Sequence, residues 1–208
     1  TGKQATNPGS TRGRKKPVVA GMKPKDMIGI PWAVAFALRA DGWCLRSDVI
    51  WSKPNPYPSS VTDRPTTAHE YVFLLAKSRN YHYDAAAVAE PAAFPGRRAG
   101  YAGYSSRADA YGKRPSGNEI DGTVVANGET RNKRSVWTIA PRGAEGDHFA
   151  AMPEDLALPC ILAGSRPGDT VIDPFTGSGT TGMVAVRTGR HFVGTDLHPA
   201  YVDLAMQR

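Results

Sequence analysis

The 208-residue sequence has few cysteines and no long hydrophobic run. Its two cysteines, Cys44 and Cys160, are far apart in the chain and form no Cys-x-x-Cys pair. This argues against a zinc site and a disulfide framework, and it predicts two buried thiols in a reducing cytosol. No apolar run approaches the ~20 residues that cross a membrane, and no secretory hydrophobic segment opens the chain. We therefore expect a cytoplasmic protein that makes no membrane contact.

Acidic residues are also scarce relative to basic ones. There are 19 Asp and Glu against 26 Lys and Arg, so the formal net charge is +7. Such an excess suits a polyanionic partner such as nucleic acid, although solubility alone explains it equally well. Residues 1–16, TGKQATNPGSTRGRKK, contain five bases, no acid and no apolar period. They predict a basic arm or loop rather than part of a core.

Regular secondary structure is expected next. A helix is predicted from about Pro31, because proline suits the first helical turn, to a stop at Asp41-Gly42. Residues 43–53 alternate loosely and are rich in β-formers, and 69–78 form a near-continuous apolar run. The first pattern is typical of a strand and the second of a strand buried on both faces. The two strands are expected to pair as an antiparallel edge of a larger sheet.

The middle of the chain, about 84–147, has a weaker pattern. It is rich in Gly, Tyr and Arg, and basic and aromatic side chains interleave along it. This suits phosphate contact and base stacking, although a disordered soluble loop has the same composition. We expect a loop-rich insertion that contacts DNA. Its basic and aromatic residues are Tyr101, Tyr104, Tyr111, Arg97, Arg98, Arg107, Lys113 and Arg114.

A regular pattern returns towards the C-terminus. A helix is predicted over 153–164 and a strand over 170–173, followed by a glycine turn and a helix over about 180–188. HFVGTD is then a further strand and HPAYVDLAMQR a further helix. The expected order is β-turn-α-β-α, a parallel unit with a right-handed crossover.

The glycine turn, DPFTGSGTTG at 173–182, contains a literal Gly-x-Gly-x-x-Gly at Gly177, Gly179 and Gly182. Because it follows a strand and opens a helix, its backbone can approach a ligand closely and the helix offers unpaired N–H groups. Asp196 ends the next strand about twenty residues later, where a ribose-binding carboxylate is expected. The combination predicts an adenosine-containing cofactor. The alternative is a tight turn whose glycines serve packing only.

The residues around the turn narrow the kind of cofactor. A phosphate-cradling P-loop needs Gly-Lys-Ser/Thr, and here Thr180-Thr181 follows Gly179 without a lysine. A nicotinamide dinucleotide is disfavoured because the carboxylate of Asp173 would repel a pyrophosphate, whereas it would suit the amino group of a methionine moiety. Few residues follow Asp196, whereas a dinucleotide fold needs several more strands. A nicotinamide oxidoreductase stays the most distant alternative.

Two stretches together resemble a known family. VIDPFTGSGTTG and, after it, HFVGTDLHPAYVDLA are similar to the S-adenosylmethionine (SAM) site of the DNA amino-methyltransferases, which methylate adenine at N-6 or cytosine at N-4. The position of this site near the C-terminus resembles the permuted, or beta, order of that family. In this order the catalytic half and the target-recognition region precede the cofactor half.

Three further stretches agree with the family. HFAAMPEDLALPCILAGSRPGD resembles the helix and lead-in that close over the methionine end of SAM. DVIWSKPNPYPSSVTDRPTTAHEYVFLLAKS resembles the paired strands and DNA-facing loop of the catalytic half, and RSVWTIAP resembles the exit from the recognition region. The resemblance covers roughly 22–208, with a gap over the variable middle.

The resemblance implies an α/β fold, namely a Rossmann-like SAM-dependent methyltransferase sheet with helices on both faces, in permuted order, plus a loop-rich target-recognition insertion. Residues 1–84 are then a catalytic-half remnant with a basic N-terminal arm and edge strands, 85–147 the target-recognition region, and 148–208 the SAM-binding half. A bacterial or phage-encoded enzyme is implied, which acts on double-stranded DNA at the nucleoid. A cognate restriction endonuclease is its functional partner, and a homodimer is one compatible state.

The resemblance also implies roles for single residues in the SAM site. Asp173 is expected to face the methionine amino group, Asp196 to accept from the ribose hydroxyls, and Leu197 to flank the adenine. Phe149, with His148 nearby, is expected on the methionine side, although core packing and a surface loop stay equally open for them. The implied cofactor-binding residues are Phe149, Ala150, Asp173, Phe175, Gly177, Ser178, Gly179, Thr180, Asp196 and Leu197.

DNA contacts are expected mainly after the first strand. Prolines hold the loop at Lys53-Pro54-Asn55 open, so Lys53 and Asn55 are expected to reach a phosphate or a flipped base, although an ordinary strand-ending turn is the alternative. The His69-Glu70 pair is interpreted as structural. The implied DNA-binding residues are Lys53, Asn55, Arg64, Arg107, Lys113 and Arg114.

The sequence lacks the catalytic turn of the family. There, a flipped base attacks the SAM methyl in line while an Asp- or Ser-Pro-Pro-aromatic turn accepts the amino hydrogens and stacks on the base. No Pro-Pro-Tyr, Pro-Pro-Phe or Pro-Pro-Trp occurs here, because Pro54, Pro56 and Pro58 are separated. We expect that this turn belongs to an N-terminal part outside the chain, and that the chain alone cannot methylate. A non-catalytic SAM- or DNA-binding module is the alternative, and adenine and cytosine both stay open as the target.

Overall fold

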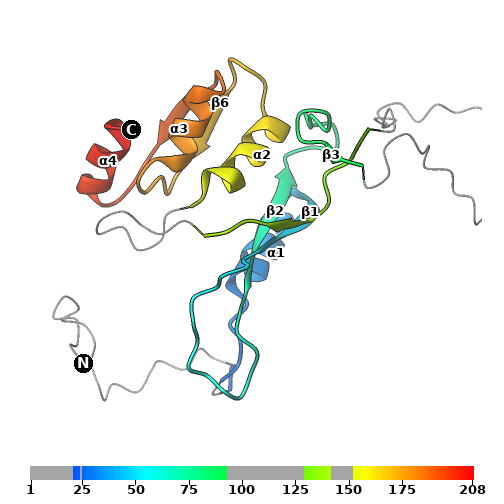
Figure 1. The fold of residues 1–208 in the computed structure, drawn as a ribbon, viewed down its shortest axis with the longest axis vertical. Helices are drawn as coiled ribbons and strands as arrows, with labels where there is room; N and C mark the ends of the chain where they lie inside the picture. The colour runs from blue at the N-terminus through cyan, green and yellow to red at the C-terminus, as the bar shows by residue number, and fades with distance from the viewer. Residues whose placement is uncertain (1–20, 24, 93–128, 142–151) are drawn as a thin grey trace, which may run out of the picture.

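The computed structural model describes residues 21–23, 25–92, 129–141 and 152–208 (Figure 1). Its elements, in chain order, are α1 (Ile30–Ala40), β1 (Cys44–Ser52), β2 (His69–Ala76), β3 (Glu90–Pro91), β4 (Thr130–Arg131), β5 (Val136–Thr138), α2 (Glu154–Gly164), β6 (Thr170–Asp173), α3 (Thr180–Arg187), β7 (His191–Gly194) and α4 (Pro199–Met206). Some predictions lie outside the described residues, namely those for the basic arm at 1–16, for His148, Phe149 and Ala150, and for the basic and aromatic residues of the middle segment. These last are Arg97, Arg98, Tyr101, Tyr104, Arg107, Tyr111, Lys113 and Arg114. None of the described helices is long and apolar enough to cross a membrane.

Helix α1 packs against the hairpin of β1 and β2, and its position confirms the sequence prediction. Pro31 stands in its first turn, and the chain leaves the helix through Gly42, whose φ of 99° favours glycine. Trp32 lies edge-on to Tyr71 and Phe73 of β2, with ring centroids 5.4 and 4.9 Å away. This aromatic cluster fixes α1 on one face of the hairpin.

A three-stranded sheet with the order β2-β1-β5 contains the hairpin. β1 and β2 are antiparallel, as predicted, with Ser52 opposite His69, and β5 runs parallel to β1 with Ile50 opposite Val136. The expectation that the second strand is buried on both faces is wrong, since only Ala76 of β2 is buried within the described structure. Helix α1 covers one face of β2, whereas the other face borders a cavity and not a packed layer.

The C-terminal unit β6-α3-β7-α4 confirms the predicted β-turn-α-β-α order. β6 and β7 are parallel, with Asp173 opposite Gly194, so both strands end at the same edge. Helix α2 packs beside α3 (Figure 1). Their contact forms a core of Ala157, Ile161, Val184 and Ala185. On the outer face of β6, Ile172 is 70% exposed, so the described chain covers this small sheet on one face.

A buried arginine connects the ends of α2 and α3. Arg190 is 8% exposed, and its guanidinium donates to Ser165 Oγ at 3.2 Å, to the Ser165 carbonyl at 2.7 Å, and to the carbonyl of Thr188. Because a buried donor without a partner is costly, these bonds hold the start of β7 against the end of α2. The glycine turn lies at the opposite end of the same strands and is positioned by this arrangement.

β3 and β4 pair as a two-stranded ribbon, which we call the β3–β4 neck. It brings together the two ends of the middle segment, 93–128, which lies outside the described residues. Glu90 lies opposite Arg131, and the Ala92 N–H donates to the Glu129 carbonyl at 2.8 Å. The Glu90 carboxylate accepts from Arg131 Nε at 2.8 Å and from Arg134 Nε at 2.5 Å. Desolvation opposes ionisation there, yet the two guanidinium groups hold the pKa of Glu90 below its usual value.

Candidate cofactor site

The glycine turn connects β6 to α3 at the carboxyl ends of the parallel strands. Gly177 and Gly179 have φ values of 52° and 82°, in the left-handed region that favours glycine. A β-carbon on Gly179 would lie 2.7 Å from Ala205 Cβ and 2.9 Å from Ala205 Cα, because α4 packs directly against the turn. Close packing against α4 is therefore one reason for a glycine at 179, which is the reason given by the alternative interpretation that the glycines serve packing. The left-handed backbone conformation is a second reason.

Asp173 organises the turn from the end of β6. Its Oδ1 accepts the Phe175 N–H at 2.9 Å, and its Oδ2 accepts the Thr181 hydroxyl at 2.7 Å. Both carboxylate oxygens thus bind groups of the turn itself. Sequence reasoning missed Thr181, although the Thr-Thr pair after Gly179 was a visible signal. The expected contact of Asp173 with a methionine amino group stays a prediction.

Asp196 lies where the sequence predicted it, beside the glycine turn. Its Oδ2 accepts the Gly177 N–H at 3.0 Å, and its Oδ1 accepts the His198 N–H at 2.8 Å. The carboxylate is half-buried between the ends of β6 and β7. The structure therefore brings together a left-handed glycine backbone and a carboxylate from positions nineteen residues apart. A carboxylate in this position binds ribose in dinucleotide-binding folds, and the same contact by Asp196 stays a prediction.

Two apolar side chains that follow the strands at this edge are exposed. Phe175 follows β6 and is 85% exposed, and Leu197 follows β7 and is fully exposed. Ser178 and Thr180 are instead buried, and the hydroxyl and carbonyl of Ser178 both accept from Arg208 at 3.3 Å. Phe175 and Leu197 are thus free to flank a planar ring, whereas Ser178 and Thr180 can offer mainly backbone groups.

The donor set fits an adenosine-bearing cofactor. Helix α3 begins at the turn with no acidic residue in its first turn, so its unpaired N–H groups favour a negatively charged or polar ligand group. The carboxylate of Asp196 suits hydroxyl groups, and the open apolar side chains suit a base. In the described ranges, no group of three His, Cys, Asp or Glu residues is placed to hold a metal ion.

The residues predicted to contact DNA before β2 lie in a different part of the molecule. The Lys53 ammonium pairs with Glu70 and lies 4.3 Å from the centroid of the Trp51 ring, so its charge is partly engaged. Asn55 and Arg64 are exposed in the segment between β1 and β2. The structure does not bring these three residues into contact with the glycine turn.

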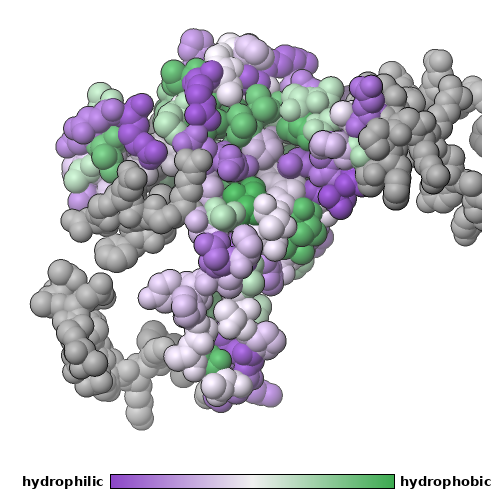
Figure 2. Space-filling view, viewed as in Figure 1, coloured by the Kyte–Doolittle hydropathy of each residue, from purple (hydrophilic) through white to green (hydrophobic). Residues whose placement is uncertain are grey.

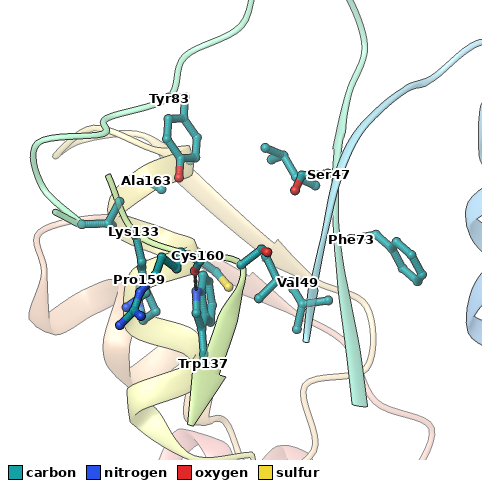
Figure 3. Close-up of a pocket in the computed structure, with 15 residues that line it drawn as sticks. Ser47, Val49, Phe73, Tyr83, Lys133, Trp137, Pro159, Cys160 and Ala163 are labelled. Atoms are coloured by element: carbon teal, nitrogen blue, oxygen red, sulfur yellow. Dashed lines mark hydrogen bonds between the residues drawn. The ribbon is translucent and has the colours of Figure 1, made fainter. Parts of the chain in front are cut away.

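A second concave feature is an apolar cavity of about 210 Å³ between the β2-β1-β5 sheet and α2. Figure 3 shows Pro159 and Cys160 of α2 facing Val49 and Trp137. Pockets for small molecules usually exceed roughly 300 Å³ and contain converging polar groups, so this cavity is a poor candidate for a ligand site. No residue of the glycine turn lines it.

The prediction of two buried thiols is wrong for the described structure. Cys44 is half-buried, and Cys160 presents its surface to the apolar cavity. Desolvation by the cavity walls raises the pKa of Cys160 to about 11, against a smaller opposing effect of Lys133. At neutral pH very little thiolate forms there.

Gly179→Ala is expected to lower the free energy of unfolding by about 2–5 kcal/mol, since a left-handed residue costs roughly 1–2 kcal/mol and overpacking roughly 1–3 kcal/mol. The contact with Ala205 is the source of the second cost. Gly168→Ala is the matched control, because Gly168 has a φ of 88° but a β-carbon added there would meet no atom within 4 Å. Denaturant unfolding of both variants measures the difference, and equal losses would exclude the steric part.

Comparison with known proteins gives one family and several close relatives. The N6/N4 DNA methylase family model matches residues 7–207. The chain is 44% identical to the Type II methyltransferase M.Cfr9I of Citrobacter freundii over 202 residues, which are 97% of this chain and 56% of the relative. It is 43% identical to the Type II methyltransferase M.SmaI of Serratia marcescens over 206 residues, 99% of this chain and 60% of the relative. The chain therefore spans less than two thirds of the length of these relatives.

Solved structures with the same fold include a SAM complex and a DNA methyltransferase. A crystal structure of an M1.HpyAVI–SAM complex has a TM-score of 0.56 at 19% identity, covering 88% of this chain and 71% of that one. The cytosine-N4-specific PvuII DNA methyltransferase has a TM-score of 0.61 at 21% identity, covering 90% of this chain and 59% of that one. The predicted Rossmann-like α/β fold of SAM-dependent methyltransferases is thus confirmed.

Proposed function

Because the chain belongs to the N6/N4 DNA methylase family, we propose that it forms the SAM-binding and DNA-facing part of an amino-methyltransferase. The enzyme transfers a methyl group from SAM to the exocyclic amino nitrogen of cytosine or adenine in duplex DNA. The single observation that carries the proposal is the hydrogen bond of the Gly177 N–H to Asp196, at the shared carboxyl edge of β6 and β7.

SAM, when bound, supplies a methyl group that is activated for nucleophilic attack. In the proposed site, Asp196 accepts the ribose hydroxyls and Leu197 lies against the adenine, while the backbone from Phe175 to Thr180 lines the cofactor. Asp173 keeps the turn in shape through Phe175 and Thr181, which orients the donor groups before any ligand binds. Pre-organisation of this kind reduces the entropy lost on binding. Phe149 and Ala150 are proposed to approach the methionine end.

Two steps of the proposed reaction need more than this chain. The target amine is conjugated and is a poor nucleophile, and acceptors that localise its lone pair would come from a Pro-Pro-aromatic turn that these 208 residues do not contain. Base flipping would expose the amine to the methyl donor. We propose that a further part of the enzyme supplies the turn, that the enzyme acts in the bacterial cytoplasm, and that a cognate endonuclease or a second copy is a partner.

Calorimetric titration with SAM and, separately, with NAD tests the cofactor. We expect SAM to bind and NAD not to bind, because Asp173 places negative charge next to the turn where a pyrophosphate would lie. Binding of NAD in preference to SAM would overturn the proposed function. Binding of SAM without any DNA affinity would favour the second candidate, a non-catalytic cofactor-binding module, which the absent catalytic turn also favours.

A further inference from the structure

The segment between β1 and β2 carries a second candidate site, in a different part of the molecule from the glycine turn. Figure 1 shows residues 53–68 as the lowest loop of the ribbon, and Figure 2 shows that this end stands clear of the main body. Lys25 Nζ pairs with Asp63 at 2.6 Å, which ties the loop to the segment before α1. The loop is therefore a projecting arm that an exposed ion pair joins to the segment before α1.

A shallow depression of about 380 Å³ lies in this arm. Its lining combines one guanidinium with five hydroxyl groups, and none of the described residues that line it is acidic. A phosphate group carries acceptors only, so a wall of donors without carboxylates suits it. The donors belong to Tyr57, Ser59, Ser60, Arg64, Thr66 and Thr67.

The charges around the depression favour the same ligand. Asp63 is engaged by Lys25, and Glu70 is engaged by Lys53, so the acidic groups nearest in sequence already have cationic partners. Arg64 has no carboxylate partner within the described residues, and its Nη1 makes a long contact of 3.5 Å with Thr67 Oγ1. A planar guanidinium with spare donors is the side chain best suited to bind phosphate.

We propose that this depression binds one phosphate of the duplex DNA backbone, and we call it the phosphate seat. Arg64 is the charged contact and the surrounding hydroxyls are neutral donors. Tyr57, which is 92% exposed, adds an amphipathic ring at the rim for the adjoining sugar. The inference rests on the proposed function, because DNA supplies the phosphate. In this inference, the arm positions the protein along the DNA backbone and does not read the bases.

Arg64→Gln tests the site in the full chain, with duplex affinity measured by fluorescence anisotropy over a series of salt concentrations. We expect about tenfold weaker binding at low salt, and a plot of log affinity against log salt that is shallower by about one. Thr67→Val should weaken binding without changing that slope, since it removes a neutral donor. Arg79→Gln is the matched control, because Arg79 is exposed beyond the far end of β2 and should behave as wild type.

The outcomes separate this inference from the function on which it rests. If the wild-type chain binds SAM but no duplex, the DNA part of the proposed function fails and the phosphate seat fails with it. If the wild-type chain binds duplex and Arg64→Gln has the same affinity and salt slope, only the phosphate seat is overturned. If inorganic phosphate binds the wild-type chain but not Arg64→Gln, and yet does not weaken duplex binding, the depression is a free-anion site and the proposed phosphate seat for DNA is overturned.

Discussion

Replacing Asp196 with alanine is expected to weaken SAM binding by at least about 100-fold, because hydrogen bonds to a charged group each contribute roughly 1.5–3 kcal/mol. The proposed ribose contact loses its acceptor. The turn also loses the bonds from the N–H groups of Gly177 and His198, so its backbone is no longer held in the binding conformation. Asp196→Asn keeps one acceptor oxygen, and an intermediate affinity is expected. Isothermal titration of the purified variants measures the series.

Asp203→Ala is the control for this experiment, because Asp203 is exposed on α4 and should leave SAM affinity unchanged. Thermal unfolding of each variant distinguishes loss of the site from loss of the fold. A folded Asp196→Ala variant that binds SAM as tightly as wild type would show that the carboxylate takes no part in the site.

The purified 208-residue chain is expected to transfer no methyl group to duplex DNA, even where it binds SAM. Electrostatic stabilisation by a single well-placed group is worth about 10²–10³ in rate, and the absent turn would supply several such contacts. We therefore expect a rate at least about 10³-fold below that of a complete enzyme. Incorporation of tritiated methyl groups into duplex DNA measures it.

M.SmaI is the positive control in the same assay, since the chain matches 60% of its length. Addition of the part of that relative outside the match, as a separate polypeptide, would supply candidate residues for the missing step. Robust transfer by the chain alone would contradict the expectation, because it would mean that acceptors for the target amine lie within these 208 residues.

The sequence predicted the C-terminal unit well because its determinants are local. Proline, glycine and apolar period define each helix and strand there. Parallel strands must end at one edge, so a carboxylate expected at the end of the second strand lies beside the glycine turn, as the bond of the Gly177 N–H to Asp196 shows. The engagement of Asp173 by Thr181 was not predictable in the same way. Side chains of one turn compete for a carboxylate, and only their three-dimensional arrangement decides which of them binds it.

Other features were not predictable because tertiary neighbours decide them. Cysteine composition favoured buried thiols, yet Cys160 borders a cavity that only the packing of α2 near β5 creates. Lys53 pairs with Glu70, seventeen residues away, because the hairpin register sets Glu70 opposite Trp51. The middle segment has no period from which contacts follow, so the predicted division at 84 and 147 stays a prediction.

The β3–β4 neck also bears on how such a protein can diversify. The Ala92 N–H donates to the Glu129 carbonyl, and this bond joins the two ends of the middle segment without depending on the side chains between them. Doubling the length of a flexible connection costs only about 0.6 kcal/mol in closure entropy. Insertions, deletions or exchange of the connecting sequence can therefore accumulate there during evolution without altering the strand pair that joins its ends.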